Sequence, residues 1–342
     1  MTAGADALWR RLAAGQDGEG LPATVARRFG DLVGPALAAS LLGPGGLDPD
    51  TVARSTLAGR FALATQRKWL ARIIAEGPPV VVLKGFALAH QIYPDAASRC
   101  MGDLDVLVRP RDRDRLIDLL ARDGFAFRPL PTPPWGFIST ASYMPFASAD
   151  GACNLDIHIH PDCYPAYRSM TTEAVFAAAV TATSAGMQFH VPCREHALML
   201  CATNAAKDKF GPFAARKFVD AMRLVASGPV DWPTLDHLAA AGNYALPLHA
   251  FLRLLRLLGV PAAALPAQVG TPLPWPRRRA FAAVLAEVRE LWPSEPGLAA
   301  TLVRELLLCT EPAVGLHNAA ARLRGLIRPH RGMPGDAARL RS

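Results

Sequence analysis

The sequence lacks the features of a membrane or secreted protein. No stretch of about 18 residues is apolar and free of charge, so we expect no membrane-spanning helix. The segment from Met1 to Asp6 has no basic region followed by an apolar one, so no signal peptide is expected. The six cysteines are scattered and form no Cys-x-x-Cys pair, which disfavours a disulfide framework or a zinc cluster. We therefore expect a cytoplasmic protein with reduced thiols.

A nucleotide-binding P-loop is also missing. The segment Gly43-Pro44-Gly45-Gly46 is not followed by Gly-Lys-Ser/Thr, so it is interpreted as a linker. The net charge is +8, carried largely by arginine, which favours anionic partners such as nucleotides or nucleic acid. A general preference for arginine over lysine would produce the same excess, so the charge alone does not decide between these explanations.

Length and hydrophobic periodicity predict an α+β fold. The chain has 342 residues, of which 51% are hydrophobic, enough for two or three subdomains. Apolar residues at helical spacing predict helices before residue 78 and from about Thr172 onward, and short β-branched runs predict strands between them. We divide the chain into an N-terminal helical region (1–78), a small α/β core with a mixed sheet (79–165), a helical C-terminal domain (166–328) and a disordered basic tail (329–342). The predicted strands are Val80–Leu83, Leu104–Val108, Phe125–Arg128, Tyr143–Ala147 and Asn154–His158.

The segment Met101–Val108 carries two aspartates in an apolar run. Side chains on a strand alternate between faces, so Asp103 and Asp105 would share one face with Cα atoms about 6.6 Å apart. Two carboxylates side by side repel and are costly to bury, so a cation such as Mg²⁺ should compensate them. The alternative is that Asp103 is a turn residue after Gly102 and that Asp105 is an ordinary surface carboxylate.

A third carboxylate follows on the predicted strand Asn154–His158. Asp156 and His158 alternate with apolar residues and therefore share a face. Three acidic groups from neighbouring strands can hold two divalent ions, which is a typical arrangement for transfer of phosphoryl groups. Alternatively, Asp156 lies on the solvated face of an edge strand.

These segments resemble a known family. Leu83-Lys-Gly-Phe-Ala-Leu88, Arg99-Cys-Met-Gly-Asp-Leu-Asp-Val-Leu-Val108 and Leu155-Asp-Ile-His158 resemble the uncharacterised bacterial nucleotidyltransferases of the DNA polymerase β-like superfamily, over roughly residues 55–260. The resemblance implies an enzyme that moves a nucleoside monophosphate from a nucleoside triphosphate, most commonly ATP, to a hydroxyl or similar acceptor and releases pyrophosphate. It implies Mg²⁺ or Mn²⁺ as cofactor, Asp103, Asp105 and Asp156 as catalytic and metal-binding residues, and Gly85 as the turn glycine beside the triphosphate.

The turn at Lys84-Gly85-Phe86 departs from the superfamily pattern, which usually has a serine or a second glycine after the first glycine. Lys84 can replace the missing hydroxyl as a phosphate contact, or it can be a lysine that extends its charge into solvent at the end of a strand. Arg99, His158 and Lys217 are further candidates for nucleotide binding. For Arg99 and Lys217 the alternative is an ordinary solvated side chain.

Two other functions remain open at this stage. A non-catalytic member of the same fold would bind a nucleotide or RNA. A metallohydrolase would use Asp156, His158 and His160. Separately, His158, His160 and Cys163 form a His-x-His-x-x-Cys pattern that could bind a transition metal, although no second half of a zinc site is visible nearby. The acceptor of a transferase could be a small molecule, a peptide, a protein or RNA, and the Pro-rich segment Pro129–Phe137 is expected to shape its pocket.

Overall fold

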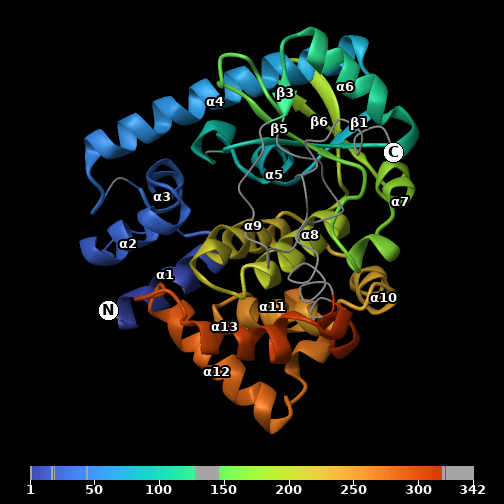
Figure 1. Cartoon of the computed structure of the whole chain (residues 1–342). Coiled ribbons are helices and arrows are strands. Elements are labelled where there is room, and N and C mark those ends of the chain that lie inside the picture. Colours follow the sequence, from blue (N-terminus) through green and yellow to red (C-terminus); the bar gives the residue numbers. More distant parts are fainter. Residues whose placement is uncertain are drawn as a thin grey trace.

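The computed structural model describes residues 2–127 and 146–317 together with residue 320, apart from residues 17, 19, 44 and 100. Helices from both ends of the chain flank a mixed sheet (Figure 1), so the predicted α+β class is confirmed. The helices are α1 (Thr2–Ala14), α2 (Ala23–Val33), α3 (Pro35–Leu42), α4 (Pro49–Glu76), α5 (Lys84–Ile92), α6 (Arg113–Arg122), α7 (Thr172–Ala177), α8 (Arg194–Lys207), α9 (Ala215–Ala226), α10 (Trp232–Ala241), α11 (Ala245–Leu257), α12 (Trp275–Arg289) and α13 (Leu298–Arg304), which continues as a π-helical turn over Glu305–Cys309.

The sheet of the described residues has seven strands in the order β3-β4-β5-β2-β1-β7-β6. β2 pairs in parallel with β5, and β1 pairs in parallel with β7, whereas the other neighbours are antiparallel. The strands are β1 (Val80–Val82), β2 (Leu104–Val108), β3 (Ala126–Phe127), β4 (Phe146–Ala147), β5 (Asn154–His158), β6 (Val180–Ser184) and β7 (Met187–Val191).

The two faces of the sheet belong to different hydrophobic cores. Val80, Val82 and Val106 pack in the cluster that includes residues of α4 and α6. Val81 and Leu107, which alternate with them, join the core formed by the helices of the other half. Because Asp105 has the same parity as Leu107, its side chain points toward α5, α8 and α9, which lie beneath the sheet in Figure 1.

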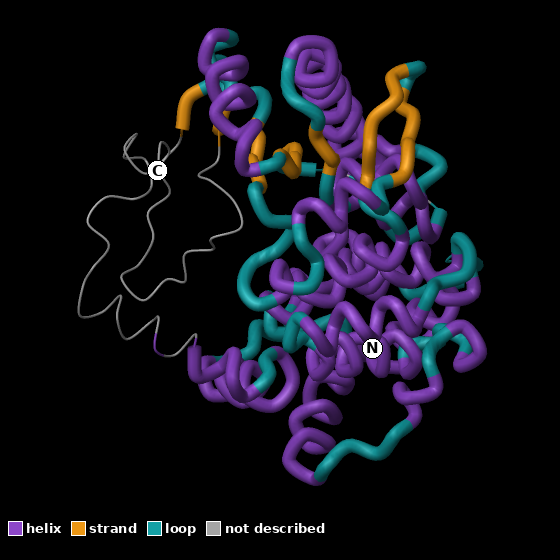
Figure 2. Tube along the Cα trace, turned by 90° about the vertical axis from the view of Figure 1, so that its right-hand side faces the viewer, coloured by secondary structure: helices purple, strands orange, loops and turns teal. Residues whose placement is uncertain are grey.

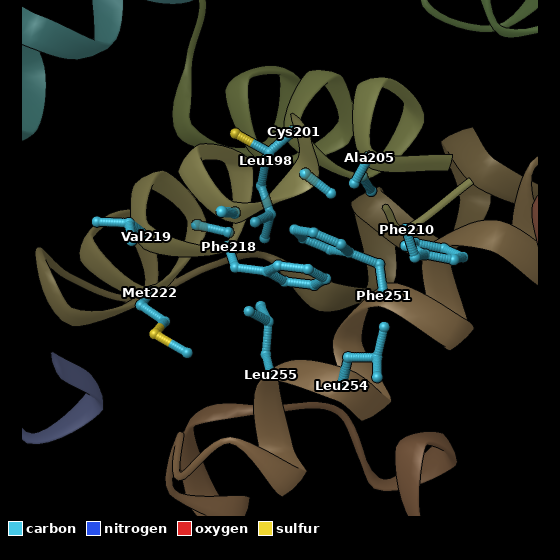
Figure 3. Packing of buried hydrophobic residues seen from close by; sticks show 14 of the residues in the cluster. Leu198, Cys201, Ala205, Phe210, Phe218, Val219, Met222, Phe251, Leu254 and Leu255 are labelled. Atoms are coloured by element: carbon cyan, nitrogen blue, oxygen red, sulfur yellow. The ribbon is translucent and has the colours of Figure 1, made fainter. Parts of the chain in front are cut away.

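The core of the helical half is built from segments at opposite ends of the chain. Phe218 of α9 stacks on Phe251 of α11 with ring centroids 5.2 Å apart (Figure 3). Trp9 of α1 packs edge-on against Phe218 and Trp292, and its indole N–H donates to the carbonyl of Val288 over 2.9 Å. The N-terminal helix therefore shares a core with the C-terminal helices, and Figure 2 shows the helices filling one end of the molecule while the strands gather at the other.

The sheet extends further along the chain than the sequence indicates. β6 and β7 form a hairpin in a segment expected to be mostly helical, and β7 pairs with β1 at Val81. The division of the chain at residues 165 and 166 stays a prediction, but strands reach as far as Val191. The predictions for Pro129–Phe137 and for the basic tail lie outside the described residues, as do most of the predicted strand Tyr143–Ala147 and Cys100.

Two other expectations from the sequence concern membrane-spanning helices and the cysteines. No helix in the described part of the chain is both long and apolar enough to cross a membrane. The cysteines at 153, 163, 193, 201 and 309 are free and buried or half-buried, as expected for structural thiols.

Candidate metal and nucleotide site

Asp105, Asp156 and His158 form a cluster on the face of the sheet that points toward the helical half. Asp105 on β2 is the register partner of Asp156 on the parallel strand β5, and His158 lies two residues further along the same face of β5. His158 Nε2 is 2.9 Å from Asp105 Oδ1 and 3.2 Å from Asp156 Oδ2. One ligand atom from each residue lies within 4.8 Å of the others, so the three side chains can converge on one cation.

A lysine side chain enters this cluster. Lys84 is the first residue of α5, separated from strand β1 by Leu83, and its backbone has a positive φ of 47°. Its Nζ lies 2.5 Å from Asp105 Oδ1, 3.2 Å from His158 Nε2 and 4.0 Å from Asp156 Oδ2. The ammonium group therefore contacts all three members of the cluster and supplies the positive charge that the buried Asp105 requires.

The charges in this cluster shift the pKa of each partner. Burial would raise the pKa of Asp105, but the nearby Lys84 and His158 outweigh it, so the pKa lies well below the usual range. Burial and the charge of Lys84 would lower the pKa of His158, but its hydrogen bonds with Asp105 and Asp156 raise it overall. Burial likewise opposes the charged form of Lys84, whereas the two carboxylates raise its pKa. In the absence of a metal ion, opposite charges therefore hold Lys84 and the cluster of Asp105, Asp156 and His158 together.

Asp103 stands apart from this cluster. It precedes β2, which begins at Leu104, and its side chain is exposed at the edge of a pocket. Although the residue keeps solvent-exposed surface, partial burial of its carboxyl group at the pocket and the negative charge of Asp105 raise the pKa of Asp103 to about 6. The structure therefore brings Asp105 and Asp156 together with His158, while the predicted role of Asp103 as a metal ligand stays a prediction.

The donor set of the cluster suits a hard or borderline divalent cation. Two carboxylates and one imidazole are ligands that Mn²⁺ and Mg²⁺ accept, with the imidazole favouring the transition metal. The close approach of the three ligand atoms also matches a shared ion. The residues present therefore fit the implied metal, provided that Lys84 leaves the carboxylates.

A pocket of about 230 Å³ adjoins the cluster. Its walls come from the beginning of α5, the segment around Asp103 and the helices α8 and α9. Lys84 and Gly85 line it, so the N-terminus of α5, where backbone N–H groups favour anions, borders the cavity. The pocket thus lies between the sheet and the helical half.

Gly85 is needed at this wall because another side chain comes very close. A Cβ added at Gly85 would lie 2.9 Å from Arg99 Nη1 and 3.2 Å from Met101 Cγ. Both Arg99 and Met101 are buried, so neither side chain can move away from such a Cβ without disturbing the pocket wall. Gly85 lines the pocket, and its predicted role beside a triphosphate stays a prediction.

Arg99 is committed to an ion pair. Its Nε donates to Asp220 Oδ1 over 2.8 Å and its Nη2 donates to Asp220 Oδ2 over 2.6 Å, and the hydroxyl of Tyr93 donates to Oδ1 over 2.7 Å. Arg99 is 7% exposed and Asp220 is 1% exposed. The guanidinium therefore links the segment before β2 to α9, and Arg99 also lines the pocket.

Lys217 also lines the pocket, from α9. Its Nζ donates to Asp208 Oδ2 over 2.8 Å and to the carbonyl of Phe213 over 2.7 Å. Its side chain remains partly exposed, so the charge borders the cavity while it is held by two residues of the segment between α8 and α9. The predicted contact between Lys217 and a nucleotide stays a prediction.

Of the three residues of the metallohydrolase hypothesis, Asp156 and His158 lie together, but His160 is not part of their cluster. His160 stacks on Tyr167 with ring centroids 4.5 Å apart, and burial lowers its pKa. Within the described residues, the cluster that could hold a metal contains Asp105 in place of His160 and does not include Cys163. The Asp156, His158 and His160 arrangement is therefore not the one that the fold assembles.

Sequence reasoning missed a second ion pair, whose carboxylate is buried. Asp162 accepts hydrogen bonds from Lys207 and Thr203 of α8 and from the backbone N–H of Cys163, the last over 2.7 Å. Nothing in the local sequence marks Asp162, which follows β5 in a loop, or its partner Lys207. This pair and the pair of Arg99 with Asp220 connect the sheet to α8 and α9.

Comparison with known proteins bears on the same region of the chain. A family model for uncharacterised nucleotidyltransferases matches residues 53–259, which include the cluster, the pocket and the helices α8 and α9. No match was found among curated proteins or solved structures.

Proposed function

Because the chain belongs to this family of uncharacterised nucleotidyltransferases, we propose that it transfers a nucleoside monophosphate from a nucleoside triphosphate, ATP in the first instance, to a hydroxyl of an acceptor. The observation that supports this is the position of Asp105, Asp156 and His158 beside a pocket lined by the N-terminus of a helix. Carboxylates that can hold a divalent cation next to a site for anions are what this reaction requires.

In the proposed reaction, the acceptor oxygen forms a bond to the α-phosphorus, and the bond from that phosphorus to the oxygen bridging to the β-phosphate breaks. Pyrophosphate leaves with that electron pair. Asp156, whose side chain is partly exposed, is the base that takes the proton from the acceptor hydroxyl. Asp105, Asp156 and His158 would hold Mg²⁺ or Mn²⁺, with Asp103 as a further carboxylate. The bound ion supplies charge neutralisation for the phosphates and the leaving pyrophosphate.

The chain itself positions the nucleotide. The backbone of Gly85 lets the phosphates approach the N-terminus of α5, and the charges of Lys84 and Lys217 face them from two sides of the pocket. Arg99 supports the wall behind Gly85 through its bond to Asp220. The acceptor can be a small molecule, a peptide, a protein or RNA, and its identity follows from the assay below.

Release of pyrophosphate tests the proposal. The full chain is incubated with Mg²⁺ or Mn²⁺, each of the four nucleoside triphosphates and pools of candidate acceptors. Asp105→Asn and Asp156→Asn should each lower turnover at least about a hundredfold, because preorganised charge is then lost at the reacting phosphate. Asp118→Asn, an exposed carboxylate on α6, serves as the matched control and should leave turnover unchanged. Full activity in either site variant contradicts the assignment.

One observation favours a second candidate function. Lys84 already neutralises the carboxylates, so a protein that binds a nucleotide or RNA without catalysis would need no metal in this cluster. Isothermal titration with ATP in the presence and absence of Mg²⁺ separates the two functions. Binding that does not depend on the metal, without pyrophosphate release for any acceptor pool, favours the non-catalytic role.

A further inference from the structure

The ammonium of Lys84 occupies the position that a metal ion needs. Asp105 Oδ1 is 2.5 Å from Lys84 Nζ, and the same Nζ lies 3.2 Å from His158 Nε2 and 4.0 Å from Asp156 Oδ2. These are the three side chains whose ligand atoms come within 4.8 Å of one another. The chain thus places its own cation among the ligands that it would offer to a divalent ion.

The ammonium of Lys84 and a divalent metal ion cannot occupy the cluster at the same time. A divalent ion such as Mg²⁺ binds carboxylate oxygens at about 2.0–2.1 Å, which would put it against an ammonium that is hydrogen-bonded to the same oxygen. The repulsion between the two positive charges would be strong because Asp105 is 3% exposed and shielded from water. Since a buried carboxylate without a cation is also costly, Asp105 keeps one positive partner in either state.

The side chain of Lys84 can adopt a second position, in the adjoining pocket. Its side chain is 30% exposed, and its residue lines the pocket together with Gly85 and Lys217. A flexible four-carbon stem allows the ammonium to leave Asp105 by rotation of side-chain bonds, without any movement of the strands. The phosphates of a nucleotide in this pocket would offer the displaced charge a new partner.

We propose that Lys84 is an exchangeable internal cation, which closes the cluster of Asp105, Asp156 and His158 until a divalent metal displaces it. The displaced ammonium then contacts the phosphates of the bound nucleotide. The first step depends only on the cluster, whereas the second rests on the proposed nucleotidyl transfer. The exchange couples metal binding to the formation of the nucleotide site.

Chemical labelling of the wild-type protein tests the exchange without any mutation. The metal-free full chain is treated with a limiting amount of formaldehyde and borohydride, with and without Mn²⁺, and methylation of each lysine is measured by mass spectrometry. Lys84 should react slowly without metal and faster once Mn²⁺ is bound. Lys68, which is exposed on α4, and Lys207, which is paired with Asp162, are internal controls whose reactivity should not change.

Metal affinity gives an independent measurement. Lys84→Met removes the charge and keeps most of the stem, so it should bind Mn²⁺ about tenfold more tightly if the cluster of the wild type is open about a tenth of the time. Lys84→Met should also melt at a lower temperature than the wild type without metal and gain more from added Mn²⁺. Lys68→Met should bind Mn²⁺ like the wild type. If Lys84→Met does not fold, Lys84→Arg is measured beside the labelling experiment and should bind Mn²⁺ no more tightly than the wild type.

The outcomes separate the exchange from the proposed function. Mn²⁺ binding with unchanged reactivity of Lys84, or with no gain of affinity in Lys84→Met, overturns the exchange alone. Absence of Mn²⁺ binding in the wild type and in both Lys84 variants overturns the metal site and the exchange together. Exchange without pyrophosphate release in the transfer assay counts against the proposed function and leaves the exchange standing.

Discussion

Arg99 and Asp220 form a bidentate buried ion pair that joins the segment before β2 to α9. The pair fixes the separation between the sheet, which carries Asp105, and the helix that carries Lys217. Burial would lower the pKa of Arg99, but Asp220 raises it, so the guanidinium stays charged. The pocket between the two halves therefore depends on a polar contact that has been withdrawn from water.

Asp220→Asn should destabilise the protein by about 3–5 kcal/mol, because it leaves a buried guanidinium without a counter-charge. Urea unfolding of the wild type and the variant measures the difference. Tyr93→Phe removes a single hydrogen bond to Asp220 over 2.7 Å and is the control, with an expected loss of about 1–2 kcal/mol. A loss for Asp220→Asn no larger than that for Tyr93→Phe would show that the pair does not hold the two halves together.

Gly85→Ala should cost stability and weaken nucleotide binding. The added Cβ would meet Arg99 Nη1 at 2.9 Å, and Arg99 cannot move away without breaking its bonds to Asp220. Overpacking of this kind costs about 1–3 kcal/mol, which urea unfolding detects. The affinity for ATP with Mg²⁺, measured by titration calorimetry, should fall in parallel.

Gly102→Ala is the matched control for this prediction. A Cβ at Gly102 would meet nothing within 4 Å, although the residue lines the same pocket. Its stability should stay within about 0.5 kcal/mol of the wild type. Equal losses in the two variants would mean that the close approach of Arg99 is not the cause.

The strands that carry the candidate ligands could be predicted because their patterns are local. A short apolar run places Asp105 within Leu104–Val108, and alternating apolar residues place Asp156 within Asn154–His158. These are the bounds of β2 and β5. That the two aspartates are register partners follows from the parallel pairing, which the sequence does not specify by itself. The shared face expected for Asp103 and Asp105 requires strand geometry at Asp103, but β2 begins only at Leu104.

The β6–β7 hairpin and the buried ion pairs could not be predicted in the same way. β6 is an edge strand whose side chains are mostly exposed, so it shows no apolar alternation, and its stability comes from pairing with β7. The turn uses Ala185 and Gly186 at positive φ, and alanine is not a usual residue there. Arg99 and Asp220 are 121 residues apart, and no local pattern reports such a contact.

Lys217→Met should weaken the binding of ATP with Mg²⁺ by about tenfold, because a charge is lost from the wall of the pocket proposed to hold the phosphates. The turnover at saturating ATP should change less than the affinity if Lys217 acts only in binding. Titration calorimetry and steady-state rates give the two quantities, and Lys68→Met on the opposite face of the sheet is the charge-matched control. An unchanged affinity would place the nucleotide away from α9.

Asp103 should make the metal-free protein less stable as the pH rises from about 4 to 6. Its pKa is about 6 in the folded protein and 3.8 in the unfolded chain, so between these values the folded state binds more protons. Stability from this residue is therefore complete below pH 4 and is lost as the pH rises through 6. Because the side chain is exposed, solvent screening limits the effect to about 1 kcal/mol.

Asp103→Asn removes this titration and keeps the shape of the side chain. Compared with the wild type, the variant should therefore gain stability on going from pH 4.5 to pH 7, when both are unfolded by urea in the presence of a chelator. Added Mn²⁺ should stabilise the wild type more than the variant at pH 7 if the Asp103 carboxylate is a further metal ligand, because the variant keeps Asp105, Asp156 and His158 but lacks that carboxylate. A constant difference between the two proteins across this pH range would show that the pKa of Asp103 is not raised in the folded protein.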